Sequence, residues 1–416
     1  MTRSSWSILW VAFLAGVIAT LVQFSIPPVM PLLQDQFALS YTDSALLMSL
    51  FALATLLAAV PGGFIVQRYG VRNIGLLAIA ILLLGIVVCF FANTFAILLL
   101  GRIIGGIGFG LVSVAAPSAI GQYIPPRMMS IAMGIWSIWI PLGSLVMFLL
   151  APKVVLTFQS SVYWILLMGI LVIGFLLYAR FIPKMETKQG ESHSIALPKE
   201  IIKSEIKNMK VWWLAIAFAS FTICLFSFTT WISTYLTETS SMSLVAAAFV
   251  PSIVSIFLMF SNFYSGVILQ KLGNRFLLFL MLPLVFALTW PIFTTGSLPL
   301  LYTGAIIIGL VGGFIPTVAF ASAPLLAKRK ETIGIAMSIV IIGENVGILI
   351  GPEVFGFMRE LTGSFVPSFW MLLFFGLINV VASLQIWRSG VFAKAGEKRT
   401  APAPELNGSG VLTEEV

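Results

Sequence analysis

Long apolar runs, separated by short polar loops, make up most of this chain. A helix that crosses a bilayer needs about 20 mostly apolar residues, and runs of that length predict about twelve such helices here. They are expected at residues 7–28, 44–66, 74–93, 95–121, 130–151, 160–182, 211–235, 243–268, 275–295, 299–322, 333–356 and 366–387. The pattern therefore predicts an all-α membrane protein.

Two polar stretches divide the apolar pattern. Residues 183–210 are rich in lysine and glutamate, which indicates a solvated linker with room for one amphipathic helix at the membrane surface. Residues 388–416 are rich in Ala, Pro, Gly and charge, which predicts a disordered tail. The expected organisation is a six-helix half at 1–182, a linker at 183–210, a second six-helix half at 211–387 and a tail at 388–416.

Composition and charge placement support the membrane assignment. The chain is 59% hydrophobic and 9% charged, whereas soluble domains carry about 25% charged residues. A net charge of +8 is also found in proteins that bind nucleic acid, but here the Lys and Arg residues lie in alternate short loops, so they indicate the orientation of the chain in the membrane. The opposite loops hold Asp35, Asp43 and Glu238, with only Lys153 and Arg359 as basic residues. We expect a multi-pass plasma (inner) membrane protein with both termini in the cytoplasm and no nucleic-acid partner.

Few residues suit catalysis or metal binding. Cys89 and Cys224 lie inside apolar runs, and His193 stands alone in the polar linker. This set predicts no disulfide framework, no metal site, no cofactor and no enzymatic activity. The first apolar run is too long for a signal sequence and is expected to be retained as the first span.

The two halves of the sequence repeat each other. Residues 63–72 read GFIVQRYGVR and residues 266–275 read GVILQKLGNR, so that the shared positions are separated by 203 residues (Gln67 and Gln270, for example). Parallel repeats of six helices, with a site near mid-membrane between them, are a known transporter architecture. The repeat predicts that Gly70 and Gly273 occupy equivalent turns.

The first of these loops resembles the signature of the major facilitator superfamily, Gly-x-Leu-x-Asp-Arg-x-Gly-Arg-Lys. The matching positions, which we take as gating-loop candidates, are Gly63, Gln67, Arg68, Gly70 and Arg72, with Gln270, Gly273 and Arg275 in the second repeat. Gln67 stands where the family has Asp. The departure weakens transfer of the family's charged gate and suggests a neutral, hydrogen-bonding version in both halves.

Three further spans carry family-like patterns. Residues 101–110 resemble the family's Arg-x-x-x-Gly-x-Gly helix, and residues 343–352 resemble its Gly-Pro-rich helix, of which residues 134–143 are a weaker form. Together with the prolines at 27, 28 and 31, these patterns are most similar to cyanate and organic-anion permeases. The resemblance implies two six-helix pseudo-repeat halves and secondary transport by alternating access.

Charged and polar residues within the spans are the site candidates, because an intramembrane charge is expensive and usually functional. Arg102 is a candidate for anion binding or proton coupling, or a structural arginine that bonds backbone carbonyls. Glu344 is a candidate proton carrier, or a permanently protonated structural acid. Glu353 is expected nearer the interface. Possible cavity-lining residues are Gln23, Asn345, Thr229, Thr230, Ser233, Trp136 and Trp139, for which interhelical bonding or packing is the alternative.

These observations favour a secondary active transporter of a small organic solute, with an organic anion preferred because Arg102 is the basic residue deep in a span. The driving force is expected to be an ion gradient or the solute's own gradient, with protons as the candidate coupling ion for symport. The bilayer, protons and the solute are the expected partners of a monomer. The alternative is a proton-driven exporter of apolar compounds. A membrane-embedded receptor or enzyme would leave the duplication unexplained.

Overall fold

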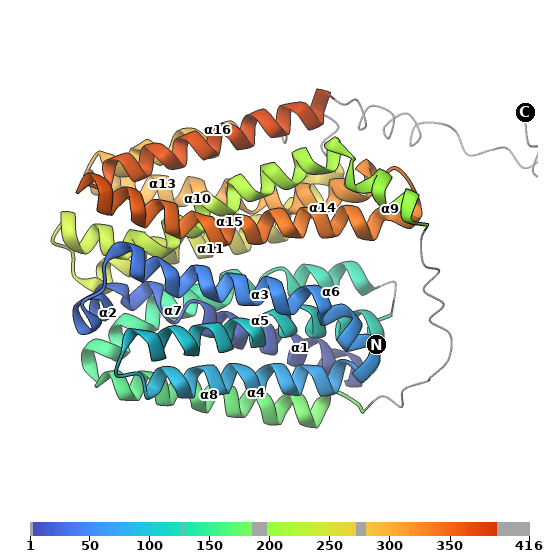
Figure 1. Ribbon diagram of the computed structural model, residues 1–416, viewed down its shortest axis with the longest axis horizontal. Helices are drawn as coiled ribbons and strands as arrows, with labels where there is room; N and C mark the ends of the chain where they lie inside the picture. The colour runs from blue at the N-terminus through green and yellow to red at the C-terminus, as the bar shows by residue number, and fades with distance from the viewer. Residues whose placement is uncertain (1–2, 126–127, 185–197, 272–279, 389–416) are drawn as a thin grey trace, which may run out of the picture.

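The protein is two helical bundles that lie side by side (Figure 1). The computed structural model describes residues 3–125, 128–184, 198–271 and 280–388. The first bundle consists of α1 (Arg3–Gln23), η1 (Pro27–Val29), α2 (Met30–Phe37), α3 (Tyr41–Tyr69), α4 (Val71–Phe90), α5 (Phe95–Tyr123), α6 (Met129–Trp136), α7 (Trp139–Thr157) and α8 (Ser160–Phe181). After α9 (Lys199–Ile206), the second consists of α10 (Met209–Thr239), α11 (Leu244–Lys271), α12 (Leu282–Thr289), η4 (Trp290–Thr294), α13 (Leu298–Gly312), α14 (Phe314–Leu326), η5 (Lys330–Thr332), α15 (Ile333–Thr362) and α16 (Val366–Arg388).

Length and apolar composition make 11 of the described segments candidate membrane spans. The first of them, Ser5–Phe37, joins α1, η1 and α2. The span expected at 275–295 corresponds to the shorter apolar segment Leu282–Thr294, and residues 272–279 before it lie outside the described residues. The all-α membrane fold predicted from the sequence is confirmed, and no strand occurs in the part of the chain that the structure describes.

The ends of helix α3 show how local sequence sets the helix boundaries. Ser40 caps its first turn, because the Ser40 hydroxyl accepts from the Asp43 amide while the Asp43 carboxylate accepts from the Ser40 amide. At the other end, Gly70 has φ +80° and joins α3 directly to α4. A side chain is strained at that φ, which explains the glycine of the loop motif.

Glycines bring two helix pairs into backbone contact. A Cβ added at Gly101 or Gly108 of α5 would collide with backbone atoms of α4, and one at Gly343 or Gly347 of α15 would collide with the backbone of α10. Close packing of this kind is what small residues provide in membrane helices. The glycine patterns of these spans therefore serve helix packing.

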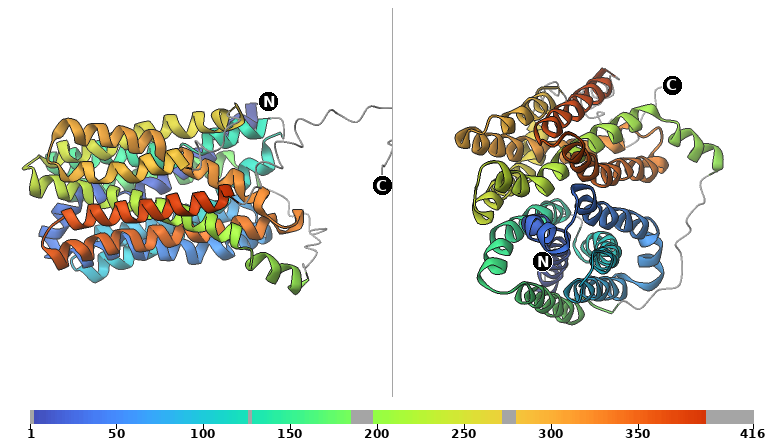
Figure 2. Two further views of the ribbon diagram at one scale, coloured as in Figure 1. Left: turned by 90° about the horizontal axis from the view of Figure 1, so that it is seen from above. Right: turned by 60° about the vertical axis from the view of Figure 1, so that its left-hand side comes forward.

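The two bundles touch along three seams. Helix α3 lies against α15, α7 against α11, and α10 against η1 and α2. The N-terminus and α9 lie at one end of the molecule, which we call the linker end (Figures 1 and 2). The opposite end, where α3 begins and α10 and α15 finish, is called the distal end.

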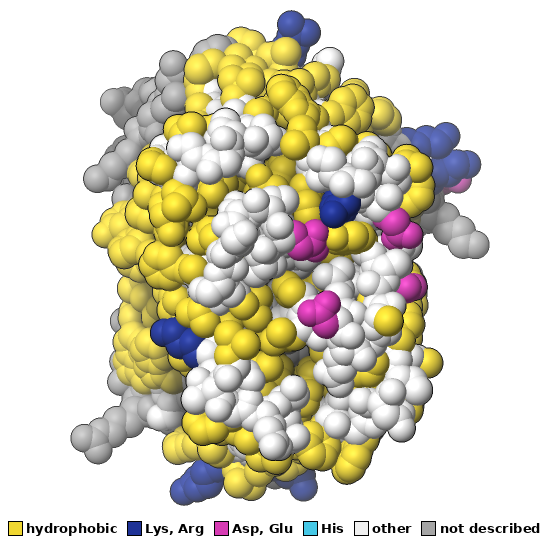
Figure 3. Space-filling view, turned by 90° about the vertical axis from the view of Figure 1, so that its left-hand side faces the viewer, with side chains coloured by type: hydrophobic (Ala, Val, Ile, Leu, Met, Phe, Trp, Pro, Cys, Tyr) yellow, Lys and Arg dark blue, Asp and Glu magenta, His cyan; other side chains and the backbone are white. Residues whose placement is uncertain are grey.

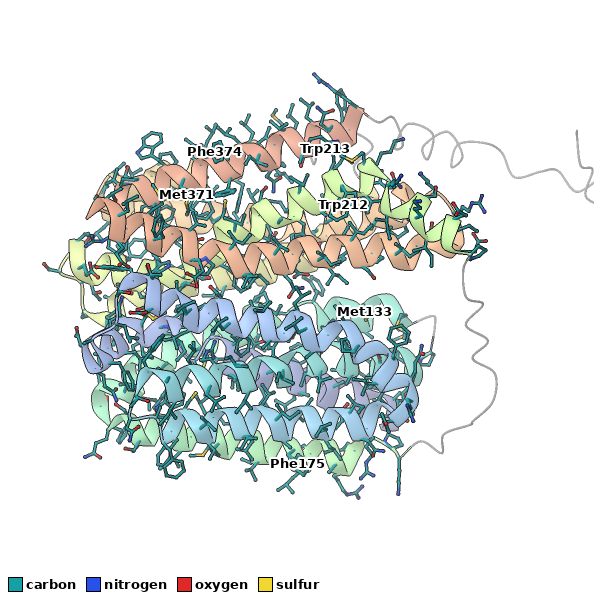
Figure 4. The ribbon with its side chains drawn as sticks, in the orientation of Figure 1. Met133, Phe175, Trp212, Trp213, Met371 and Phe374 are labelled. Carbon is teal, nitrogen blue, oxygen red and sulfur yellow. The ribbon has the colours of Figure 1, made fainter. Side chains whose placement is uncertain are left out.

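Apolar side chains cover the outer faces of both bundles. Phe374 of α16 is 60% exposed, and it lies on the opposite outer face from the partly exposed Phe175 of α8 (Figure 4). Exposed Leu, Ile and Phe residues continue along α4, α8 and α16. A surface of this kind suits lipid as the surrounding solvent.

Helix α9, within the expected linker, is attached to the second bundle through a buried carboxylate. Glu205 accepts hydrogen bonds from the Asn208 amide at 2.8 Å, the Lys328 backbone N–H at 3.0 Å and the Thr332 hydroxyl at 2.8 Å. Three donors satisfy its charge despite its burial. The linker helix is thereby fixed to the start of α15.

Candidate functional site

The first span is broken at its distal end by two prolines. Pro27 and Pro28 have no N–H, so the carbonyls of Gln23 and Phe24, four residues earlier, lose their usual helical donors. Helix α1 accordingly ends at Gln23, and a short 3-10 helix begins at Pro27. Free carbonyls in a buried, apolar setting need another donor.

Arg102 of α5 supplies donors to this break. Its guanidinium donates to the carbonyls of Val22 at 2.7 Å, Gln23 at 3.0 Å and Leu47 at 2.9 Å. Weaker contacts reach the Ser25 hydroxyl at 3.4 Å and the Met48 sulfur at 3.6 Å. Each of the five N–H groups that an arginine carries has a partner.

Arg102 is almost completely buried and lies against an aromatic ring. The side chain is 2% exposed, and its guanidinium carbon lies 4.2 Å from the centroid of the Phe51 ring. Among the described residues, no aspartate or glutamate forms an ion pair with it. In this conformation Arg102 therefore presents no free donor to a solute, while its positive charge stays unpaired.

Hydroxyl groups follow one face of α10. Four of them, on Ser227, Thr230, Ser233 and Thr234, have no hydrogen-bond partner and belong to residues that are 0% exposed. Thr229, another expected cavity residue, instead donates to the Leu225 carbonyl of its own helix at 2.9 Å. Ser227 and Thr234 were not among the sequence candidates, although they too are polar residues in an apolar run.

This face of α10 is turned toward the first bundle. Phe226 stacks on Phe24 of the α1 break at a centroid distance of 6.0 Å, and α10 contacts η1 and α2. Residues three, four and seven positions along a helix share a face. Thr230 and Ser233 therefore lie over the α1 break, where the amide oxygen of Gln23 is also buried without a partner.

Glu344 and Asn345 lie near the middle of α15. The Glu344 backbone carbonyl accepts from the Thr222 hydroxyl of α10 at 3.0 Å, while no hydrogen bond is found for its carboxyl among the described residues. Glu344 lies one turn before Ile348, which packs into the core of the first bundle, so both residues face that bundle. Asn345 donates to the Ile341 carbonyl of its own helix at 2.9 Å.

Trp136 and Trp139 lie at the junction of α6 and α7. Their rings stack at 4.8 Å, and Trp139 stacks on Phe109 of α5 at 5.4 Å. Gly16 of α1 faces both indoles, since a Cβ there would collide with them. The structure thus places Trp136 in an aromatic stack against α1.

The gating-loop candidates of the first repeat lie at the linker end. Gly63, Gln67 and Arg68 are exposed on α3, whereas Arg72 donates to the Ala179 carbonyl of α8 at 2.7 Å. The side chain of Gln270 lies outside the described residues, as do Gly273 and Arg275. The predicted equivalence of the two turns therefore stays a prediction.

A polar cluster that the sequence did not reveal joins the two bundles at the distal end. The Tyr41 hydroxyl donates to the Glu238 carboxylate at 2.7 Å, and the Thr42 hydroxyl donates to Glu360 at 2.7 Å. Arg359 pairs with Glu238 at 3.3 Å and lies over the Tyr41 ring. We call these five residues the distal lock.

Figure 3 shows the distal face from outside, where several acidic side chains stand near and to the right of its centre. An open pocket of about 440 Å³ lies beside the distal lock, lined by Ser40, Thr42, Asp43, Phe357, Glu360 and Leu361. Each residue of the distal lock lies near a helix end. The sequence shows that these residues are polar, but it does not show which residues of the other bundle they contact. Their closeness depends on how the two bundles meet.

Comparison with known proteins agrees with this architecture. The chain is 26% identical over 406 residues to the hexuronate transporter of Bacillus subtilis (strain 168), covering 90% of this chain and 92% of that protein. It is 23% identical over 403 residues to a probable sulfoacetate transporter of Cupriavidus necator, covering 86% and 88%.

The fold is shared with a solved structure. A bacterial homologue of the human lysosomal transporter Spinster, in an inward-facing and occupied conformation, superposes with a TM-score of 0.76 at 16% identity. That superposition covers 97% of this chain and 100% of the homologue. Residues 12–352 also match the family model of the Major Facilitator Superfamily. With the two bundles, the loop motif and this match in agreement, the chain belongs to the Major Facilitator Superfamily of membrane transporters.

Proposed function

We propose that this transporter carries a small organic anion, by alternating access and with proton symport. The observation that carries the proposal is its similarity, along almost the whole chain, to transporters named for hexuronate and sulfoacetate. Both of those solutes are organic acids that are ionised near neutral pH. Residues of both bundles then form the site, as expected for solutes bound at a repeat interface.

Electrostatics at the α1 break support an anionic solute. Arg102 is buried, and carbonyl dipoles and an aromatic ring surround its charge. An uncompensated buried charge is costly, and Coulomb attraction is strong where the dielectric constant is low. A carboxylate or sulfonate beside the break would compensate the charge, so Arg102 would attract the solute without donating to it.

Alternating access requires a state that is closed on one side. The distal lock supplies contacts that hold the two bundles together at one end, and the mid-level bond between Ser144 and Ser255 at 2.9 Å joins α7 to α11. We assign the structure to a state that is closed at the distal end. Rocking of the bundles would break the distal lock and open that side.

Charge placement supports cytoplasmic termini in a plasma membrane. The linker end carries Arg68, Arg72, Arg180, Lys203, Lys207 and Lys328. The distal end carries Asp35, Asp43, Glu238 and Glu360 beside Lys153 and Arg359, and acidic side chains are visible on that face in Figure 3. Loops rich in Lys and Arg stay in the cytoplasm. The transporting unit is taken to be a single chain, because one chain holds both bundles.

Glu344 is our candidate for the proton-coupling residue. It is the carboxyl group near the middle of α15, it faces the first bundle, and no side chain bonds it among the described residues. A carboxyl in that position can bind a proton in one state and release it when its surroundings change. Asn345 and Gln23 complete the proposed site from the two bundles, with Trp136 packed behind α1.

The test is uptake by proteoliposomes. Accumulation of labelled glucuronate or sulfoacetate on an inward proton gradient, abolished by a protonophore, is the expected result. Protection against, or efflux of, lipophilic cations without transport of either acid would favour the drug-exporter alternative and contradict the proposal.

The coupling role of Glu344 has its own test. Glu344→Gln should retain exchange of internal for external solute while losing accumulation on a pH gradient, because Gln keeps the shape but binds no proton. Glu200→Gln on α9 is the matched control and should retain both activities. A Glu344→Gln protein that concentrates solute like the parent would show that Glu344 is structural.

A further inference from the structure

We infer that the hydroxyl face of α10, formed by Ser227, Thr230, Ser233 and Thr234, binds the hydroxyl groups of the transported solute through Thr230 and Ser233, the two members that lie over the α1 break. The inference rests on the proposed function and narrows it, because the solute is then a polyhydroxylated acid. Its evidence is independent of the comparisons and consists of the bonding, position and chemistry of this face.

The four hydroxyls differ from the other hydroxyls of the same helix. A serine or threonine within a helix normally donates to a carbonyl three or four residues earlier. On α10 this occurs at Ser220, Thr222, Thr229, Thr237 and Thr239. The four hydroxyls of the hydroxyl face do not follow this rule, although their residues are 0% exposed.

Buried polar groups without partners cost free energy. One such group can be an accident of packing, but four on successive turns of one face point to a partner that is bound in another state. The Gln23 amide oxygen at the α1 break is likewise buried without a partner.

The position of the hydroxyl face determines in which state of the transporter the solute would reach it. Ser227 lies against Gly351 of α15, and Thr230 shares the side of Phe226, which stacks on Phe24 of the first bundle. The face is therefore enclosed between α15 and the α1 break while the distal side is closed. Separation of the bundles there would uncover Thr230 and Ser233, which lie on the side of Phe226, whereas Ser227 would stay against α15 of its own bundle.

Hydroxyl groups suit a particular solute chemistry. Each can donate one hydrogen bond and accept two, and positions three, four and seven residues apart form a row along the helix. A row of this kind pairs with a chain of adjacent hydroxyls on the solute. A site built to bond hydroxyls discriminates strongly against analogues that lack them, since its own groups are then left unpaired.

The experiment compares two monovalent six-carbon acids, glucuronate and hexanoate, in proteoliposomes. We expect the parent to prefer glucuronate. The double variant Thr230→Val/Ser233→Ala should lose at least tenfold in kcat/KM for glucuronate and change less than twofold for hexanoate. Thr230→Ser, which keeps the hydroxyl, should retain glucuronate transport.

Matched controls separate this role from general packing. Thr229→Val and Ser252→Ala remove buried hydroxyls that are bonded within their own helices, and both should leave the preference for glucuronate unchanged. The thermal melting of every variant is recorded. If the double variant does not fold, the comparison is made with Thr230→Val alone.

Three results would overturn the inference. Equal losses for both acids would mean that the face is structural, and no loss for glucuronate would mean that the face does not touch the solute. A parent that carries hexanoate but not glucuronate would refute the hydroxylated class while leaving the organic-anion proposal intact. Transport of neither acid, nor of sulfoacetate, would refute the proposed function itself.

Discussion

Arg102 and the hydroxyl face of α10 are two buried polar regions that meet at the α1 break, and they differ in whether their hydrogen-bonding groups have partners. Every N–H of Arg102 has a partner in the first bundle, whereas the four oxygens of the hydroxyl face have none. A fully bonded group holds a fixed structure, because losing any partner is costly. A buried hydroxyl that has no partner within the protein can form a hydrogen bond to a solute that binds and dissociates. In the proposed mechanism, Arg102 therefore belongs to the scaffold and the hydroxyl face to the solute path.

The largest effect is expected from Arg102→Ala. The change removes the only donor to the Gln23 carbonyl found among the described residues and takes a donor from the Val22 and Leu47 carbonyls. One unsatisfied buried group alone costs about 1–3 kcal/mol. A marked fall in the melting temperature of the purified protein is the expected result. Arg180→Ala, at an exposed arginine on α8, is the control and should melt like the parent.

The same variant tests the anion hypothesis. If Arg102→Ala melts normally and loses only affinity for the acid, Arg102 contacts the solute directly, as one reading of the sequence expected. If it melts early and also loses affinity, the arginine acts by holding the α1 break and by its charge.

A smaller effect is expected from Tyr41→Phe in the distal lock. The variant loses the bond to Glu238 between the bundles, and a partly exposed bond of this kind contributes about 1 kcal/mol. The population open at the distal end should rise about fivefold. Single-molecule energy transfer between labels at Gln36 and Ser240 would measure it.

Tyr69→Phe at the other end of α3 makes the same chemical change away from the distal lock and should leave the distances unchanged. Equal shifts in both variants would show that the distal lock does not hold the bundles together.

Ser255→Ala should have a still smaller effect. It removes the bond to Ser144 between α7 and α11, and hydrogen bonds between membrane helices average about 0.6 kcal/mol. A fall of one or two degrees in melting temperature is expected. A rise would indicate that this seam is not stabilised by its serine pair.

The smallest effect, and the opposite sign, is expected from Thr230→Val. Replacing an unbonded buried hydroxyl by a methyl group of the same shape removes a desolvation cost, so the melting temperature should stay constant or rise slightly. Together with Ser255→Ala, this gives a direct comparison of an unbonded and a bonded hydroxyl in one protein. A clear fall would mean that Thr230 has a partner in the closed state.

The sequence predicted the helices well because hydrophobic run length is set by the bilayer, whatever the packing. It also identified Arg102 and Glu344 as unusual, because charge within a span is rare. It did not decide whether Arg102 binds an anion or couples protons, or is a structural arginine that bonds backbone carbonyls. The arginine's partners are backbone carbonyls, which every residue has, and only the prolines at 27 and 28 hinted that some were free.

The hydroxyl face and the distal lock needed the structure for a different reason. Thr229 and Thr230 are adjacent and identical in type, yet one bonds its own helix and the other faces the first bundle. That difference arises from rotation of the helix and contact between the bundles. Likewise, Tyr41 and Glu238 are 197 residues apart, so their pairing follows from tertiary packing alone.

The glycine contacts between α10 and α15 have a mechanical consequence. Because Gly343 and Gly347 bring α15 onto the backbone of α10, the two helices have little freedom to slide past each other. The hydroxyl face on α10 and Glu344 on α15 therefore lie on two helices that are packed rigidly together. In the proposed mechanism, a displacement of α15 that follows protonation of Glu344 would therefore be transmitted directly to α10.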